Sequence, residues 1–153
     1  MQFDRGLEIP FLIDLTDERF KIPANHSIIE YIRRANPFAH SDLGDMLIKL
    51  AKRITGAHYY CPNFSVCAYV VLHTDGNLIF AIASDMRKFA FRLPPKVVSQ
   101  AVADGIGEYS DIGSDWLLVD AFSREMSIAA ADAAHMRLCE AAFRYAEESA
   151  ANS

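Results

Sequence analysis

The sequence is poor in cysteine, with only Cys61, Cys67 and Cys139 among its 153 residues. An odd number of cysteines cannot all pair within one chain, and a domain of this length does not need disulfides in order to fold. We therefore expect the three thiols to be reduced, as they are in intracellular proteins. This expectation excludes the class of small secreted domains that disulfides hold together.

Long apolar runs are also missing from the sequence. The apolar stretch at 66–72 is far shorter than the ~20 residues that a membrane-spanning helix needs. The first residues carry an early acid and no continuous apolar segment, so they do not resemble a signal peptide. These absences predict a cytoplasmic protein that has no membrane partner.

Hydrophobic residues, by contrast, are plentiful. They make up 52% of the chain against 23% charged residues, which is the composition of a folded domain and excludes a disordered or low-complexity segment. The length suits one domain, which we place at residues 25–153. Residues 1–24 contain Pro10 and Pro23 and are expected to form an N-terminal arm or a strand.

Apolar residues at helical spacing predict four helices. Ser27 and Glu30 form a capping-box pattern, and the Pro94–Pro95 pair suits the first turn of a helix. The predicted helices span 27–35, 41–55, 94–103 and 123–148. A long final helix rich in alanine is suited to close packing on a sheet.

Valine, tyrosine and phenylalanine mark the strands, which we predict at 65–73, 78–83, 88–93 and 115–122. Asp75, Gly76 and Asn77 provide the turn of a hairpin between the first two strands, and residues 105–114 are expected to form a loop. The predicted fold class is α+β: a single antiparallel sheet of four to five strands flanked by three to four helices.

The order of these features between Asp75 and Tyr145 is similar to a known family. A hairpin turn, the strand at 89–93, the proline pair, the strand at 115–119 and a final helix ending near 143–145 resemble the MmcQ/YjbR-like group and the related N-terminal domain of TfoX. The resemblance covers about half of the chain. It implies a small α+β domain, often described as DNA-binding, with no agreed catalytic residues.

A second resemblance rests on the helix predicted at 42–55 and on the final helix. In their order and in the acidic character of the chain, they resemble the class I type III secretion chaperones, which are small, acidic and dimeric. That resemblance implies a protein partner and makes a homodimer a possible assembly.

Four potential zinc ligands lie close together in the sequence: His58, Cys61, Cys67 and His73. Their spacing does not fit the familiar zinc motifs. Cys67 and His73 lie six residues apart on one predicted strand, a separation of about 20 Å, so one ion cannot hold both. We therefore predict no metal site and no cofactor.

A cysteine nucleophile is the other chemistry that the sequence suggests. His135 and Cys139 are neighbours on one face of the predicted final helix, and Glu140 is adjacent. However, the pattern places neither a helix N-terminus nor a cation beside the thiol, which is where reactive cysteines occur. We expect no catalytic residues and no enzymatic activity, with a small enzyme of unidentified site as an alternative.

Basic residues are missing from the stretch 97–123, and this absence points to the candidate site. The net charge is −5 over the whole chain, +2 over residues 1–103 and −7 over residues 104–153. The partner-binding residues that we predict are Asp104, Glu108, Tyr109, Asp111, Asp115 and Trp116. Carboxylates beside aromatic side chains are suited to a protein partner with a basic surface. A merely solubilising loop is the alternative reading of the same stretch.

These observations predict a non-enzymatic protein-binding module of the immunity, inhibitor or chaperone type. The alternative is a nucleic-acid-associated module that uses basic residues around the strand at 88–93, such as Arg87, Lys88 and Arg92. Nucleic acid is the less favoured partner, because the chain is acidic overall and Phe89 and Phe91 are expected to be buried.

Overall fold

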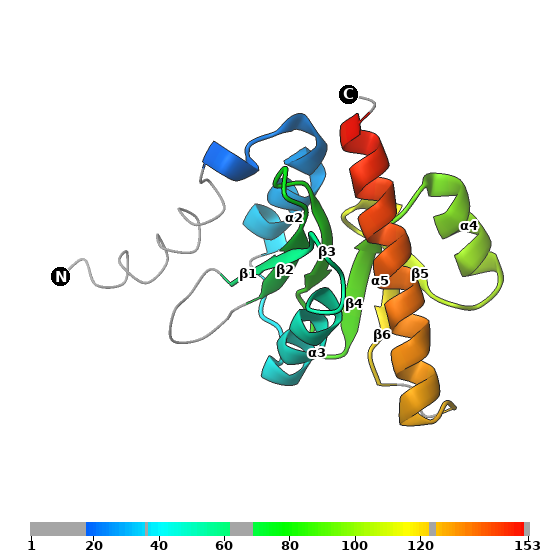
Figure 1. The fold of residues 1–153 in the computed structure, drawn as a ribbon. Helices are drawn as coiled ribbons and strands as arrows, with labels where there is room; N and C mark the ends of the chain where they lie inside the picture. The colour runs from blue at the N-terminus through cyan, green and yellow to red at the C-terminus, as the bar shows by residue number, and fades with distance from the viewer. Residues whose placement is uncertain (1–17, 36, 62–68, 123–124, 152–153) are drawn as a thin grey trace.

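The computed structural model describes residues 18–35, 37–61, 69–122 and 125–151, and these residues form one antiparallel sheet with helices on both faces (Figure 1). The helices are α2 (His26–Ala35), α3 (Ser41–Ala51), α4 (Pro95–Ala103) and α5 (Ile128–Ala151), preceded by the short 3-10 helices η1 (Glu18–Phe20) and η2 (Pro23–Asn25). The strands are β1 (His58–Tyr60), β2 (Val70–His73), β3 (Ile79–Ala83), β4 (Lys88–Arg92), β5 (Glu108–Ser110) and β6 (Gly113–Asp120).

The strands lie in the order β1-β2-β3-β4-β6-β5, and every neighbouring pair is antiparallel. The predicted hairpin turn joins β2 to β3: the Asn77 amide donates to the Thr74 carbonyl, and Asn77 has a φ of 68°. Asparagine tolerates this left-handed conformation better than most residues do. At the other end of the sheet, β5 and β6 form a second hairpin, which places β5 at the edge.

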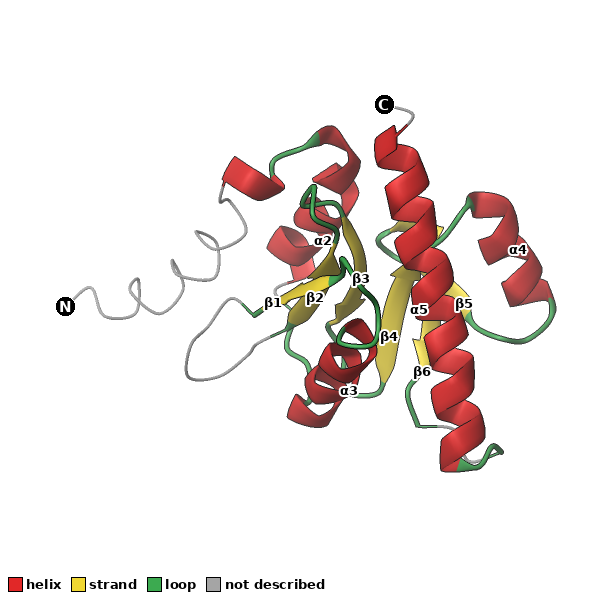
Figure 2. Cartoon of the chain, in the orientation of Figure 1, coloured by secondary structure: helices red, strands yellow, loops and turns green. Residues whose placement is uncertain are grey.

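Helices α3, α4 and α5 cover one face of the sheet, and α2 with η1 covers part of the other (Figures 1 and 2). On the first face, Leu47 of α3 and Ala142 of α5 pack in one core with Phe89 and Phe91 of β4. On the second face, Ile28 and Ile32 of α2 pack in a core with Trp116 of β6. Because both faces are covered at the centre, β3 is buried along its whole length and its sequence shows no alternation.

The architecture confirms a single antiparallel sheet with four helices in the part of the chain described here, but the sheet has six strands and not four to five. The two unpredicted strands, β1 and β5, are three residues long and lie at the two edges. The expectation of a loop at 105–114 is therefore wrong. Strands this short carry too little pattern to be recognised, and only pairing with a neighbour makes them strands.

Several predicted boundaries also differ. Helix α3 ends at Ala51 and α5 begins at Ile128, while β6 starts at Gly113 and ends before Phe122. The predicted strand residues 65–68 and the predicted cap Ser123 lie outside the described residues, as does the N-terminal arm up to residue 17. Residues 18–25 of that region form η1 and η2, and Phe20 is buried in the core beneath α2.

Cys61 and Cys139 differ in whether they form a disulfide bond. Cys61, which follows β1, is disulfide-bonded, whereas Cys139 on α5 is a free and buried thiol. The expectation of a reduced thiol is therefore wrong for Cys61, and Cys67 lies outside the described residues. The helices that are described lack the combined length and apolar content needed to cross a membrane.

Candidate functional site

The acidic segment lies at one edge of the sheet, where the chain leaves α4 and forms the β5–β6 hairpin. Asp104 is the C-cap of α4, Glu108 and Tyr109 belong to β5, and Asp111 lies in the turn that follows. All four are exposed. These four residues therefore lie along one edge of the sheet, but Tyr109 points to the α4 face, where it contacts Ser99, and Glu108 points to the opposite face, where it contacts Lys88.

The other two residues hold the sheet together. Trp116 is 1% exposed and packs in the core beneath α2, and Asp115 is only partly exposed. Arg92 Nε donates to Asp115 Oδ2 at 2.9 Å, which joins the ends of β4 and β6. Trp116 therefore does not reach the surface, whereas the aromatic side chain of Tyr109 is 55% exposed.

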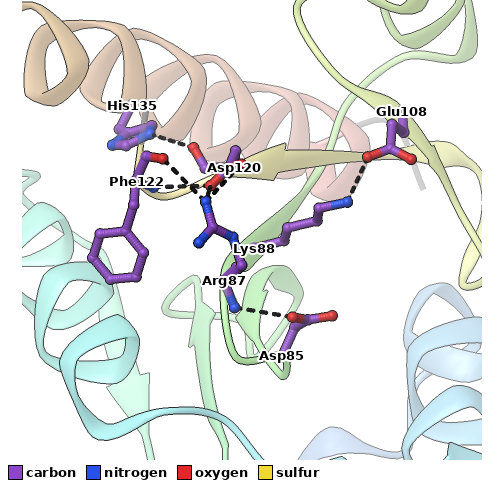
Figure 3. Close-up of polar contacts among 7 residues, drawn as sticks. All are labelled: Asp85, Arg87, Lys88, Glu108, Asp120, Phe122 and His135. Carbon is purple, nitrogen blue, oxygen red and sulfur yellow. Dashed lines mark hydrogen bonds and ion pairs between the residues drawn. The ribbon is translucent and has the colours of Figure 1, made fainter. Parts of the chain in front are cut away.

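Cations from outside the acidic segment neutralise two more of its carboxylates (Figure 3). Lys88 of β4 reaches across β6 and places its Nζ 2.6 Å from Glu108 Oε2. Arg87 Nη2 lies 3.4 Å from Asp120 Oδ2 and also donates to the Phe122 carbonyl. The hydrogen bond with Glu108 raises the pKa of Lys88, against an opposing effect of burial. The acidic segment contains no basic residues, but basic side chains from β4 and its preceding turn lie beside its carboxylates in the folded protein.

Two carboxylates of the segment form no ion pair within the described chain, although the Arg34 guanidinium donates to the backbone carbonyl of Asp111 at 3.5 Å. Asp104 accepts a hydrogen bond from the neutral Gln100 side chain at 2.9 Å, and in the described chain neither Asp104 nor Asp111 forms an ion pair. Ile106, between them, is 56% exposed. We use the name α4–β5 surface for Asp104, Ile106, Glu108, Tyr109 and Asp111.

A groove beside the start of α5 is a second feature, and sequence reasoning missed it. Three adjoining cavities of about 450, 660 and 80 Å³ have His135 in common. We call them the α5 groove. Its walls are mainly apolar, with Met46 from α3 and Ala131 from α5, together with the exposed side chains of Phe122 and Met126. The apolar residues at 126 and 128 are the one sequence feature that points to this groove. The helix predicted from residue 123 includes them, so they do not stand out as surface residues.

His135 lies at the centre of the α5 groove and is 6% exposed. Its Nε2 lies 3.2 Å from the Asp120 carbonyl, a contact drawn in Figure 3, and its ring is nearly perpendicular to the ring of Phe89. A carbonyl oxygen can only accept, so Nε2 carries the proton and Nδ1 of the neutral ring is an acceptor. Among the described residues, Nδ1 has no hydrogen-bond partner.

Two ion pairs border the α5 groove. On the α3 side, Arg53 binds both carboxylate oxygens of Asp132, at 2.8 and 3.1 Å. That pair of bonds lowers the pKa of Asp132 and raises the pKa of Arg53. Arg87 and Asp120, which contact each other, line the largest of the three cavities.

The two histidines considered as zinc ligands lie on neighbouring strands. His58 and His73 face each other across β1 and β2, with ring centroids 5.4 Å apart, and His58 contacts the carboxylate of Asp75. In the described portion, no three histidine, cysteine or acidic side chains form a group that could hold a metal ion. Cys67 lies outside the described residues.

Cys139 does not have the environment of a nucleophile. Its side chain is fully buried, and burial raises the pKa of the thiol to about 12. Almost none of it is thiolate at neutral pH, and the thiolate is the reactive form. This environment argues against the pairing of His135 with Cys139 that the helical spacing suggested.

Comparison with known proteins adds no relative: no family model, curated protein or solved structure matches this chain. The resemblances to the MmcQ/YjbR-like group and to the secretion chaperones therefore stay predictions.

Proposed function

We propose that this protein is a non-enzymatic binding module of the immunity, inhibitor or chaperone type, which binds a basic protein partner through the α4–β5 surface. The observation that carries the proposal is the exposure of Ile106 and Tyr109 along the same edge of the sheet as Asp104 and Asp111, whose carboxylates form no ion pair in the described chain. Exposed apolar and aromatic groups provide the desolvated contact, and the carboxylates steer a basic partner toward it.

Within this proposal the acidic residues have different roles. Asp104 and Asp111 attract the partner, whereas Glu108 must first release Lys88 in order to bind a new cation. Tyr109 is the anchor, and its hydroxyl donates to Ser99 of α4 at 3.4 Å. Asp115 and Trp116 support the surface from below without contacting the partner, because Asp115 is held by Arg92 and Trp116 is buried.

The pairing of the basic residues argues against the nucleic-acid alternative. Arg87, Lys88 and Arg92 each form an ion pair with a carboxylate of the acidic segment. Phosphate binding would require the protein to break these pairs, and the released carboxylates would repel the phosphates. Phe89 and Phe91 are fully buried and offer no stacking surface. The homodimer suggested by the chaperone resemblance stays a prediction.

A cytoplasmic location is part of the same proposal. The disulfide at Cys61 weighs against it, because disulfides persist mainly in oxidising compartments. Cell fractionation with an antibody to this protein tests the location directly.

The binding experiment compares two double variants with the same change in charge. Partners captured by the wild-type protein are purified, and their affinity is measured by titration calorimetry. Asp104→Lys with Asp111→Lys should weaken binding about tenfold or more at low salt, and added salt should weaken the wild-type complex. The matched control is Glu147→Lys with Glu148→Lys on α5, where both residues are exposed and far along the chain from the site. If both double variants bind the partner as tightly as the wild type does, the proposal is wrong.

A further inference from the structure

The α5 groove holds a hydrogen-bond acceptor, Nδ1 of His135, that no donor in the described chain satisfies and that solvent still reaches. His135 is more than nine-tenths buried, it lines all three cavities, and its Nε2 proton is already donated to the Asp120 carbonyl. Nδ1 is therefore an acceptor that is open to the groove, among walls that are mainly apolar. A ligand that brings a donor can replace the water at this atom, while the apolar walls favour burial of the rest of the ligand.

The walls of the α5 groove define the rest of the ligand. Met46, Phe122, Met126 and Ala131 present apolar surface, and the two main cavities, of about 450 and 660 Å³, have the size of small-molecule sites. Phe89 lines the small cavity beside His135. These surfaces favour an apolar body of one or two rings, or a short aliphatic chain.

The charges at the rim favour a ligand without net charge. Arg53 is bound by Asp132 and Arg87 is bound by Asp120, so each cation is compensated by an anion. Lys49 borders only the smallest cavity and Glu125 only the largest, and both side chains are exposed to solvent, which screens them. Neither an anionic nor a cationic ligand finds a buried group of opposite charge here.

We propose that the α5 groove is a binding site for a neutral amphipathic small molecule, an aromatic or aliphatic alcohol or a similar compound, whose hydroxyl donates to Nδ1 of His135. This site is separate from the α4–β5 surface. The proposal requires only that the groove accept an apolar body while His135 recognises the donor, and it does not depend on the protein-binding function.

The test uses two probes with the same apolar body. 2-Naphthol carries the hydroxyl donor, and 2-methoxynaphthalene replaces it with a methyl ether that cannot donate. Titration at pH 7.5, followed by the chemical shifts of groove residues, should show 2-naphthol binding about fivefold to tenfold more tightly than the ether. His135→Phe should remove this preference while it preserves apolar contact. If the wild-type protein binds neither probe, or binds both equally, the proposal is overturned.

Two further variants on α5 test the proposal even if His135→Phe does not fold. Ala131→Leu fills the groove and should abolish binding of both probes, whereas Ala133→Leu makes the same change at an exposed position of α5 and should leave binding unchanged. Circular dichroism shows that both variants are folded. Equal binding by both variants would overturn the proposal.

The same variants identify other occupants of the groove. If sedimentation shows a wild-type dimer that Ala131→Leu dissociates, a second copy of the chain fills the groove. If Ala131→Leu instead removes binding of the captured protein partner, that partner fills it. Either result assigns the groove to a protein and overturns the small-molecule proposal, while the charge-variant experiment still tests the α4–β5 surface on its own.

Discussion

Asp111 and Asp115 are four residues apart in the same acidic stretch, yet they have different roles in the structure. Asp115 lies on β6 and is held by Arg92, 23 positions earlier in the chain, whereas the carboxylate of Asp111 is in an exposed turn and forms no ion pair in the described chain. The residue type is the same, and the difference comes from what the fold places beside it. At the scale of single residues, whether a carboxylate of this segment forms an ion pair therefore depends on residues that are distant in the sequence.

Cys139 gives a prediction at the residue scale. Its thiol is buried in the core between α5 and the sheet, and burial raises its pKa to about 12. We expect Cys139 to resist labelling by a thiol reagent at pH 8 in the folded protein and to react at once in denaturant. Peptide mass spectrometry identifies the labelled residue. Labelling of native Cys139 at the rate of a free thiol would contradict its burial.

At the scale of elements, β5 depends on a close approach between backbones. A Cβ placed on Gly107 would lie 2.6 Å from the Leu118 carbonyl oxygen and 2.9 Å from Leu117 Cδ1, both on β6. Only glycine lets the chain leave α4 and pair along β6 at this distance. The edge strand that carries Glu108 and Tyr109 thus requires a residue without a side chain just before it.

Gly107→Ala should therefore destabilise the protein by about 1–3 kcal/mol, because the added methyl group must push β5 away from β6. The control is Gly76→Ala in the β2–β3 turn, where the nearest atom to the new Cβ is 3.8 Å away and the free energy of unfolding should change little. Urea unfolding measures both. A Gly107→Ala protein as stable as the control would mean that β5 is not held against β6.

At the scale of the whole molecule, stability should depend on pH through His73. Burial lowers the pKa of His73 below its ordinary value of about 6.5, so the folded protein favours the neutral ring. Above pH 6.5 this contribution is fully present. As the pH falls below 6.5, the unfolded chain takes up a proton that the folded protein does not, and stability decreases by at most about 1.4 kcal/mol per pH unit.

Urea unfolding between pH 7.5 and pH 5 tests this dependence and avoids the titration of the carboxylates. His73→Gln removes the titrating group but can still donate to the Thr74 carbonyl, which His73 contacts at 2.9 Å. The variant should show a shallower loss of stability toward pH 5 than the wild-type protein. An equal loss in both proteins would assign the pH dependence to other groups.

Much of the fold can be predicted from local patterns in the sequence. The helical spacing of apolar side chains, the Pro94–Pro95 pair and the β2–β3 turn indicate α2, α3, α4 and that hairpin, because these elements are set by neighbours a few positions apart. The capping box predicted at Ser27 is wrong, since α2 begins at His26 and Ser27 lies inside the helix. The short edge strands β1 and β5 lack such patterns. They exist because a long neighbour offers them unpaired backbone groups.

The sequence by itself determined the α+β class, the buried core strands and the position of the acidic segment, because composition and short-range periodicity encode these features. Only the tertiary structure decided which carboxylates are neutralised, that Trp116 is buried, and that His135 lies in a groove with a free acceptor. Those properties depend on pairs such as Lys88 with Glu108 and Asp120 with His135. Such partners are separated along the chain and meet only when the sheet and α5 pack together.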